Sequence, residues 1–581
     1  MTVKTQDAIL TSNAVTVLAR RYLKKDDQGR VVESPEEMFR RVANSVAQAE
    51  LLYNGHTNIR TTEEDFFKVL ANLEFLPNSP TLMNAGRPLQ QLAACFVLPI
   101  EDSLESIFDG VKNTALIHQS GGGTGFSFSK LRPKDDSVRT TSGTASGPVS
   151  FMRVFNMATE VIKQGGTRRG ANMGILRFDH PDILEFISAK ADNRELANFN
   201  ISVAVTEEFM HSVEIDGDLP LVNPHNRQVV KTLKAREVFD RIVKMAWKTG
   251  DPGLVFLDRI NRANPTPQLG EMESTNPCGE QPLLPFEPCN LGSINLGLMI
   301  KYSNGLAEID WEKLAKTIEI GVNFLDDVID VSRYPLDEVD RMAKGNRKIG
   351  LGVMGFADLL IRLGIPYDSE EGLRTGEEIM RFVKEKGWAY SAELARKRGV
   401  FLNYPGSSYD RAGGPALRNA TVTTIAPTGT LSIIAGCSSG IEPLFALSFK
   451  RHILGDVILP EFNQCFLETA KKCGFFSDAL LMHVTAGESI QRMSEVPEDV
   501  KRLFVTAFDI APEWHVRMQA AFQRHTDNAV SKTINFPANA TEEDVRKAFI
   551  LAYREGVKGI TIFRSGSRSE QVLSCADPLY C

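Results

Sequence analysis

The stretch Ile349-Gly350-Leu351-Gly352-Val353-Met354-Gly355 is one of several short apolar runs in this chain. Similar runs lie at 94–98, 200–205 and 420–425. Amphipathic segments such as 238–248 and 370–398 alternate with these runs. Such alternation is typical of a mostly parallel sheet whose strands are joined by crossover helices. We therefore predict an α/β fold in which the sheet closes into a barrel.

The rest of the chain divides around this pattern. Residues 1–75 are polar and charged with helical periodicity, which predicts a helical N-terminal region. Repeats, low-complexity tracts and long linkers are absent from 76–567, so this part is expected to be one catalytic domain. Residues 568–581 are expected to form a flexible, cysteine-containing tail.

Composition excludes some function classes. The chain has 581 residues, 43% of them hydrophobic and 24% charged, as is ordinary for a globular protein. A net charge of -7 argues against nucleic-acid binding through the whole surface, although local basic pockets could hold phosphates. The sequence has no apolar run of about 18 residues and no signal-peptide core at its N-terminus. We expect a cytoplasmic protein without a membrane or nucleic-acid partner.

The motif Asn276-Pro277-Cys278-Gly279-Glu280 has the composition of a reaction centre. It places a thiol two residues from an amide and two residues from a carboxylate, on a loop rich in Gly and Pro. The carboxylate can take a proton, the amide can orient a hydroxyl, and the sulfur can carry a charge or an unpaired electron. A second cysteine, Cys289, follows eleven residues after Cys278.

Eight cysteines are too few for a disulfide scaffold in a chain of this length. Cys437, Cys465 and Cys473 lie in segments with the character of core or helix, so we expect them to be buried and structural. No Cys-x-x-Cys pair and no His-Glu-x-x-His motif is present, and we predict no protein-bound metal.

Three loops have the composition of anion sites. Residues 120–126 contain four glycines in five positions, which is equally typical of a glycine turn and of a ligand contact. Residues 426–432 could cradle a phosphate or simply form a capped helix start. Residues 164–170 join flexibility with two adjacent guanidinium groups, which favours an anionic or planar ligand.

Eight motifs in this order resemble the catalytic subunit of ribonucleotide reductase. They are Asn78–Leu82, Ala94-Cys95, Asp102–Ile107, Gly121–Gly123, Gln164–Gly170, Asn276–Glu280, Cys289–Ser293 and Pro427–Thr430. The resemblance covers roughly residues 75 to 575. It implies a ten-stranded α/β barrel with the Cys278 loop threaded through its centre, which agrees with the predicted sheet.

The resemblance also implies a role for each reactive side chain. Cys278, as a thiyl radical, would take the 3′-hydrogen of a ribonucleotide, while Glu280 takes the 3′-hydroxyl proton and Asn276 holds the ribose. Cys95 would protonate the departing 2′-hydroxyl, and Cys95 and Cys289 would supply two electrons by forming a disulfide. Two tail cysteines, Cys575 and Cys581, would then pass electrons from a thioredoxin-like reductant. The substrate-binding positions implied are Ser79, Thr81, Ala94, Gly123, Pro427, Thr428, Gly429 and Thr430.

The source of the radical separates the classes of this family. Class I subunits receive it through two adjacent tyrosines, but the matching segment here, 556–564, contains none. The glycyl-radical tail motif Arg-Val-x-Gly-Tyr is also absent. The resemblance therefore implies class II, in which adenosylcobalamin supplies the radical, although the Asp-x-His-x-x-Gly cobalamin motif is missing. A class I subunit that needs a metal subunit and a non-catalytic nucleotide-binding paralogue remain the alternatives.

Regulation can be predicted in part. Residues 1–75 lack an ATP-cone motif, whereas a site for dNTP effectors resembles that of the family. The effector-binding positions implied are Asp102, Arg132, Arg139, Lys163, Gln164 and Arg168. Since this site is built at a subunit interface in the family, a homodimer is expected. Similarity to dimeric class II enzymes favours ribonucleoside diphosphates as substrates.

Overall fold

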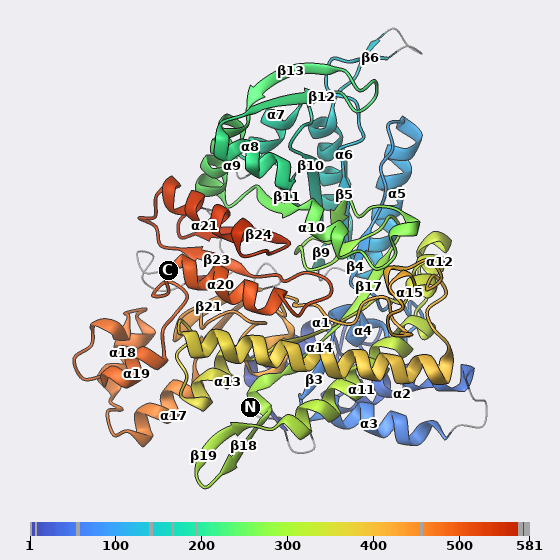
Figure 1. Cartoon of the computed structure of the whole chain (residues 1–581). Coiled ribbons are helices and arrows are strands. Elements are labelled where there is room, and N and C mark those ends of the chain that lie inside the picture. Colours follow the sequence, from blue (N-terminus) through green and yellow to red (C-terminus); the bar gives the residue numbers. More distant parts are fainter. Residues whose placement is uncertain are drawn as a thin grey trace.

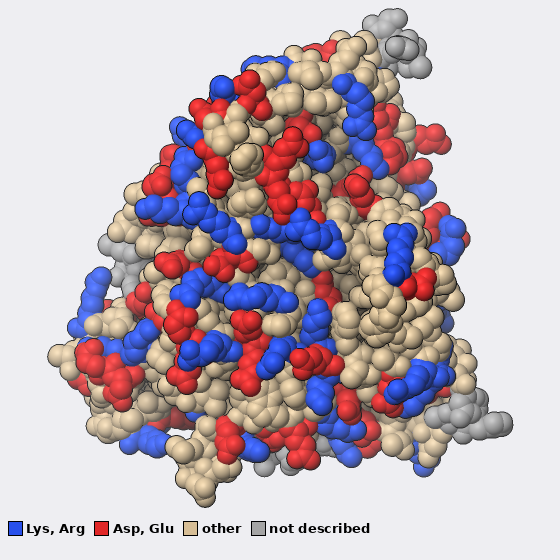
Figure 2. Space-filling model, viewed as in Figure 1, with Lys and Arg blue, Asp and Glu red and all other residues tan. Residues whose placement is uncertain are grey.

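The computed structural model describes nearly the whole chain (Figure 1). The described residues are 3–5, 8–53, 58–138, 143–164, 168–192, 194–453, 457–567 and 573–574. Among the described helices, none combines the length and apolar character that a bilayer crossing requires. On the face shown in Figure 2, acidic and basic side chains are intermingled.

The N-terminal region is mainly helical, but it begins with a hairpin that sequence patterns did not predict. The hairpin consists of β1 (Val3–Thr5) and β2 (Ala8–Leu10). The helices that follow are α1 (Ser12–Arg21), α2 (Pro35–Ala47), the 3-10 helix η1 (Gln48–Leu52) and α3 (Ile59–Ala71). Ser34 and Glu37 form a capping box at the start of α2, which satisfies two backbone amides. The apolar faces of these helices pack into one core with barrel helices.

The first half of the barrel is five parallel strands. They are β4 (Cys95–Val97), β5 (Gly123–Ser127), β10 (Asn172–Arg177), β11 (Phe199–Val205) and β14 (Gly253–Phe256). Each pairs in parallel with the next. They are buried on both faces, as parallel strands covered by crossover helices are.

The second half runs antiparallel to the first. Its strands are β17 (Pro288–Asn295), β20 (Ile349–Met354), β23 (Thr533–Phe536) and β24 (Gly559–Arg564). β17 pairs with β4 and β14 pairs with β24, both antiparallel. A further short strand, β3 (Phe75–Pro77), pairs with the outer part of β17.

The segment 421–425 closes the barrel. The sequence predicts a strand there, but the segment makes only isolated parallel bridges, Leu351 to Thr423 and Ile425 to Val530. Hydrogen bonds from Leu351 N to Val422 O (2.7 Å) and from Ser531 N to Ile425 O (2.9 Å) join it to both neighbours. The ten-stranded α/β sheet is confirmed: its strands are the nine above together with β3, and the segment 421–425 closes it into a barrel by bridging β20 to the residues before β23.

Helices cover the outside of the barrel (Figure 1). The main ones are α5 (Leu104–Ser120), α6 (Pro148–Val161), α9 (Ala235–Thr249), α11 (Trp311–Val331), α14 (Glu370–Arg398), α20 (Pro512–Gln523) and α21 (Glu542–Arg554). Shorter helices are α4 (Ser79–Asn84), α7 (Ile183–Ile187), α8 (Glu207–Ile215), α10 (Leu257–Arg262), α12 (Asp337–Asn346), α13 (Phe356–Leu363), α15 (Ser408–Arg411) and α16 (Leu431–Ala435). Helices α17 (Gln464–Lys472), α18 (Asp478–Thr485) and α19 (Glu498–Leu503) form a side lobe with its own apolar core.

Several short hairpins lie outside the barrel sheet. Their strands are β6 (Ser137–Val138), β7 (Gly143–Thr144), β8 (Lys163–Gln164), β9 (Arg168–Arg169), β12 (Asp218–Val222), β13 (Val229–Lys234), β18 (Ile300–Ser303) and β19 (Leu306–Ile309). A separate sheet combines β21 (Ser448–Ile453), β22 (Val457–Phe462) and β25 (Leu573–Ser574).

A hairpin of β15 (Ser274–Thr275) and β16 (Pro282–Leu283) lies inside the barrel, and we call residues 274–283 the finger loop. Glycines in the barrel strands give it room. A Cβ added to Gly125 in β5 would lie 1.7 Å from the carbonyl oxygen of Thr275. One added to Gly350 in β20 would lie 2.8 Å from Nε2 of Gln281. The apolar Ile349–Gly355 run therefore needs its small residues because another chain segment passes against it.

Candidate active site

Cys278 lies at the tip of the finger loop. Gly279, the next residue, has φ of +83°, which a residue with a side chain adopts at a cost. Asn276 stabilises the turn. Its side-chain Oδ1 accepts a hydrogen bond from the backbone N–H of Gln281 (3.0 Å), and its backbone N–H donates to the Gln281 carbonyl (3.0 Å). The Cys278 side chain is exposed and forms no disulfide, so the turn presents a thiol at its surface.

Both halves of the barrel anchor this tip. Asn200 of β11 donates from Nδ2 to the Pro277 carbonyl at 2.8 Å. On the opposite side, the Glu280 carbonyl accepts from Thr424 Oγ1 (3.0 Å) and from the Ala529 amide (2.9 Å). Hydrogen bonds on two sides fix the height of Cys278 in the barrel, as a reactive group that must meet a substrate requires.

Cys95 and Cys289 lie directly opposite each other on the antiparallel strands β4 and β17. Facing positions on such strands have Cβ atoms about 5 Å apart. Both thiols are buried and free, and Asn276 Nδ2 donates to Cys95 Sγ at 3.1 Å. Burial raises the pKa of both thiols well above the ordinary value, so they stay protonated at neutral pH. The barrel thus holds two neighbouring, neutral thiols.

Glu280 is a buried carboxyl, and no cationic group of the described residues compensates its charge. Burial raises its pKa to about 7, and its interactions with Asn276 and with its own backbone offset this shift only in part. Its Oε2 has no hydrogen-bond partner among the described residues. A carboxyl that titrates near neutral pH and has a free oxygen is suited to proton transfer with a bound ligand.

A cavity of about 970 Å³ opens onto Cys278. This is the upper end of the size range of small-molecule and cofactor sites. Its wall includes Pro277, Cys278, Pro427, Gly429, Gln519 and Thr561. Gln519 is buried, and its Oε1 has no partner in the described part of the chain.

The loop 427–430 borders the same cavity. Thr428 has φ of +54°, and its Oγ1 accepts from the Gly440 amide at 2.7 Å. As predicted, a helix (α16) begins directly after Thr430, although Thr430 makes no side-chain cap. Two arginines contact this loop, and sequence patterns indicated neither of them. Arg21 Nη1 donates to Thr430 Oγ1 and Arg451 Nη1 donates to the Gly429 carbonyl, each at 3.3 Å.

The other predicted substrate positions differ in placement. Gly123 lies against the finger loop, because an added Cβ would come within 2.9 Å of Pro277 Cγ, and its amide donates to the Ala94 carbonyl. Ser79 and Thr81 do not border the cavity. Ser79 Oγ bonds Tyr22 Oη at 2.8 Å, and Thr81 Oγ1 donates to the Leu92 carbonyl at 2.9 Å.

Family models match both parts of the chain. "Ribonucleotide reductase, all-alpha domain" matches residues 9–90, and "Ribonucleotide reductase, barrel domain" matches residues 93–416 and 413–563. The chain belongs to the ribonucleotide reductase family. The family prediction made from eight motifs is therefore confirmed.

Similar reductases match this chain over nearly its whole length. The chain is 49% identical over 623 residues to the "Vitamin B12-dependent ribonucleoside-diphosphate reductase" of Thermoplasma acidophilum, covering 98% of this chain and 80% of the relative. It is 52% identical over 570 residues to the protein of that name from Mycobacterium tuberculosis (strain CDC 1551 / Oshkosh), covering 98% and 81%. The alpha subunit of the Actinobacillus ureae class Id ribonucleotide reductase superimposes with a TM-score of 0.78 at 22% identity, covering 96% and 97%. This last likeness confirms the fold.

Of the predicted effector positions, the structure describes contacts of Asp102 and Arg132. Asp102 accepts from Arg132 Nε (2.8 Å) and from the Arg132 amide (3.1 Å), so these two residues are brought together. His225, which sequence reasoning missed, lies with Nδ1 3.5 Å from Asp102 Oδ2. Lys163, Gln164 and Arg168 lie on the β8–β9 hairpin, but their side chains are outside the described part. Arg139 lies outside the described residues altogether.

The remaining cysteines differ from the prediction. Cys437 and Cys465 are only half-buried and border the cavity, and Cys473 is exposed at the end of α17. Cys437 and Cys465 pack against apolar cores, so the expectation of buried structural thiols was wrong in full only for Cys473, because helical periodicity does not show which helix ends lie at the surface. Cys575 and Cys581 lie outside the described residues.

Proposed function

We propose that this chain reduces ribonucleotides to 2′-deoxyribonucleotides with adenosylcobalamin as its cofactor. The observation that carries the proposal is the exposed thiol of Cys278 at the barrel centre. It lies beside the buried thiols of Cys95 and Cys289 and the Glu280 carboxyl, whose pKa is about 7. Relatives at about 50% identity carry the name "Vitamin B12-dependent ribonucleoside-diphosphate reductase", and they favour neither a class I subunit nor a non-catalytic paralogue.

The cavity fits this cofactor. The segment that matches the tyrosines of class I, 556–564, includes β24, and its residues Thr561 and Ile562 border the same cavity as Cys278. Both side chains are smaller than that of tyrosine, which leaves more room in the cavity for a ligand. The free Oε1 of Gln519 can accept from amide groups of a large ligand. When bound, adenosylcobalamin supplies a carbon-centred radical that can take a hydrogen atom from a thiol.

Each residue of the site then has one task. Cys278 gives up its hydrogen atom and, as a sulfur radical, takes the 3′-hydrogen of the ribose. Glu280 takes the proton of the 3′-hydroxyl, which its raised pKa and free Oε2 support. Cys95 protonates the leaving 2′-hydroxyl, and Asn276 orients Cys95 and the ribose. Cys95 and Cys289 provide two electrons and become a disulfide.

Three binding assignments belong to the same proposal. The loop 427–430 holds the phosphates of a ribonucleoside diphosphate, with Thr428 and Gly429 as its central residues and Arg21 and Arg451 close by. Ser79, Thr81, Ala94 and Gly123 are the further predicted substrate positions, of which Ser79 and Thr81 do not border the cavity beside Cys278. Asp102, Arg132, Arg139, Lys163, Gln164 and Arg168 bind a dNTP effector.

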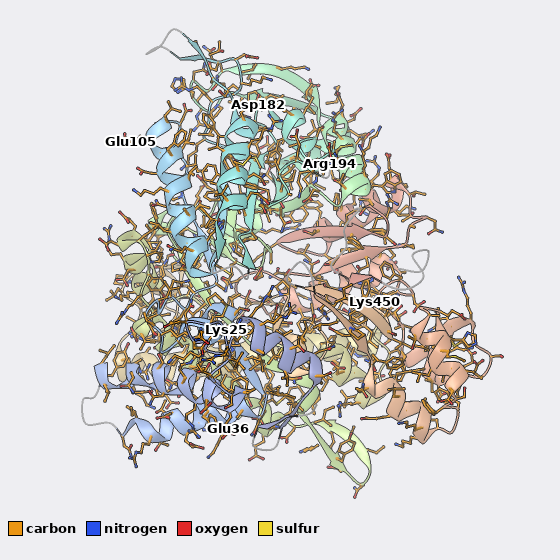
Figure 3. All side chains as sticks on the ribbon, turned by 180° about the vertical axis from the view of Figure 1, so that it is seen from behind. Lys25, Glu36, Glu105, Asp182, Arg194 and Lys450 are labelled. Carbon is orange, nitrogen blue, oxygen red and sulfur yellow. The ribbon has the colours of Figure 1, made fainter. Side chains whose placement is uncertain are left out.

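We further propose a homodimer formed through α5 and α6. Leu104 and Phe108 on α5, and Met157 and Val161 on α6, are each more than half exposed. Residues four apart share one helix face, so each helix presents an apolar pair. Glu105 marks α5 at the outer edge of the molecule (Figure 3). This surface adjoins the Asp102 site, where a second subunit would complete effector binding.

The central test is a reductase assay with purified protein, adenosylcobalamin, a cytidine diphosphate substrate and dithiothreitol. Deoxycytidine diphosphate should form without any second protein. Parallel reactions with the triphosphate test the substrate form. Activity that depends on an added metal subunit would contradict the cofactor assignment, and turnover by Cys278→Ser would contradict the thiyl assignment, since an alcohol O–H bond is too strong to replace the thiol.

The reductant assignment has its own test. If Cys575 and Cys581 carry electrons to the barrel, the double variant Cys575→Ser/Cys581→Ser should keep activity with dithiothreitol and lose it with thioredoxin. A small dithiol can enter the barrel, whereas a folded reductant cannot reach a buried disulfide. Cys95→Ser, as the control, should fail with both. Full turnover of the tail variant with thioredoxin would show that reduction takes another path.

A further inference from the structure

A buried ion pair lies next to the thiol pair, and the reaction steps above do not use it. Lys348 Nζ is 2.7 Å from Glu287 Oε2, and the two side chains are 0% and 1% exposed. The Leu284 amide and Asn346 Nδ2 also donate to Glu287, at 2.8 Å and 2.6 Å. Desolvating two charges is costly, so a buried pair of this kind is weak evidence for a stabilising role. Its position suggests another use.

The strand register places Lys348 beside Cys289. β17 and β20 are parallel with Asn290 opposite Ile349, so the residues before them, Cys289 and Lys348, are also neighbours. The contact is direct, since Cys289 Sγ donates to the Lys348 carbonyl at 3.6 Å. Cys95 lies opposite Cys289 on the other side. Three adjacent strands therefore carry a row of Cys95, Cys289 and Lys348.

The two sulfurs of this row have different surroundings. Next to burial, the Glu280 carboxylate is the charge that most disfavours a thiolate at Cys95. For Cys289, the foremost influence after burial is Lys348, which favours the thiolate, while Glu287 and Glu280 oppose it with smaller individual effects. In thiol–disulfide exchange, the sulfur that is the more stable thiolate departs faster. The structure thus distinguishes the two ends of a Cys95–Cys289 disulfide.

We propose that Lys348 stabilises Cys289 as the leaving thiolate when the Cys95–Cys289 disulfide is reduced, so that a dithiol reductant attacks Cys95. This inference rests on the proposed function. The reductant's thiolate bonds to Cys95 Sγ as the Cys95–Cys289 bond breaks, and the electron pair leaves on Cys289. The second reductant thiol loses its proton and attacks the reductant's bonded sulfur, which releases Cys95. The dithiol is oxidised by two electrons, and the two cysteines take up two protons.

The site of attack can be mapped directly. The variant Cys575→Ser/Cys581→Ser is oxidised with diamide, its Cys95–Cys289 disulfide is verified by peptide mass spectrometry, and glutathione is added as a monothiol probe. After rapid acid quenching, the glutathione adduct should be found on Cys95. An adduct on Cys289 would overturn the inference. Failure of the Cys95–Cys289 disulfide to form would contradict both this inference and the proposed function.

The role of the ammonium group is tested by the rate at which dithiothreitol reduces the same disulfide. Lys348→Met should slow the reaction at least about fivefold, whereas Lys348→Arg should restore most of the rate. Because Lys348→Met leaves Glu287 unpaired, Lys348→Met/Glu287→Gln serves as a second variant that keeps the fold. Lys190→Met is the matched control, since Lys190 is buried in an ion pair with Asp251 (2.8 Å). An unchanged rate in a folded Lys348 variant would overturn this inference alone.

Discussion

Two fully buried carboxyl groups in this molecule have opposite surroundings. The Asp326 carboxylate on α11 accepts hydrogen bonds from Arg347 Nε (2.9 Å), Arg398 Nη1 (3.0 Å) and Asn419 Nδ2 (2.9 Å). Glu280 in the finger loop has no cationic partner, and one of its oxygens has no partner at all among the described residues. Burial acts on both groups in the same direction, so the neighbours determine the difference.

The pKa values show the result. Although burial alone would raise it, the guanidinium groups of Arg347, Arg418 and Arg398 lower the pKa of Asp326 to about 2. Burial raises the pKa of Glu280 to about 7, because no guanidinium group compensates. A buried carboxylate that pairs with several arginines joins different elements, here α11, α14 and the residues just before the segment 421–425. A buried carboxyl without them can exchange a proton with a ligand.

Removing the acid at Glu280 should have the largest effect. Glu280→Gln keeps the shape of the side chain but cannot take a proton, so kcat should fall by about 10² to 10⁴. Thermal stability should stay the same or rise, since no ion pair is lost. The check is steady-state kinetics together with a melting curve. A variant with normal kcat would show that Glu280 is not the proton acceptor.

Removing the charge at Asp326 should act on stability instead. Asp326→Asn leaves buried arginines without their common partner, which should cost about 3–5 kcal/mol of unfolding free energy. The kcat of the folded protein should remain near that of the wild type, because Asp326 lies outside the active-site cavity. Denaturant unfolding and active-site titration measure the two quantities. A loss of kcat without a loss of stability would reverse the assignment.

The contrast between these two carboxyls could not be predicted from the sequence. Asn276–Glu280 stands out as a motif, and the resemblance implied its place in the barrel. However, the arginines around Asp326 come from positions 347, 398 and 418, which only the folded chain brings together. The same is true of Arg21, Gln519 and His225, whose sequence neighbours carry no signal. Apolar runs in the sequence correctly predicted β11 and β20. They also predicted a strand at 420–425, but they could not show that this segment would pair only through isolated bridges.

The smallest effect expected is a pH dependence of opposite sign at the two carboxyls. For Glu280, the folded pKa of about 7 exceeds the ordinary 4.5, so the folded state retains a proton that the unfolded state loses. Its contribution to stability is present below about pH 4.5 and is lost as the pH rises through 7. Between pH 5 and pH 8, wild type should lose about 2–3 kcal/mol more stability than Glu280→Gln.

For Asp326, the folded pKa of about 2 lies below the ordinary 3.8, so its contribution is present above 3.8 and is lost as the pH falls. Between pH 5 and pH 3, wild type should lose about 1 kcal/mol more than Asp326→Asn. Denaturant titrations of the three proteins at pH 3, 5 and 8 measure both differences. If the Glu280 and Asp326 variants shifted in the same direction, the neighbouring arginines would not be what separates a structural carboxylate from a reactive one.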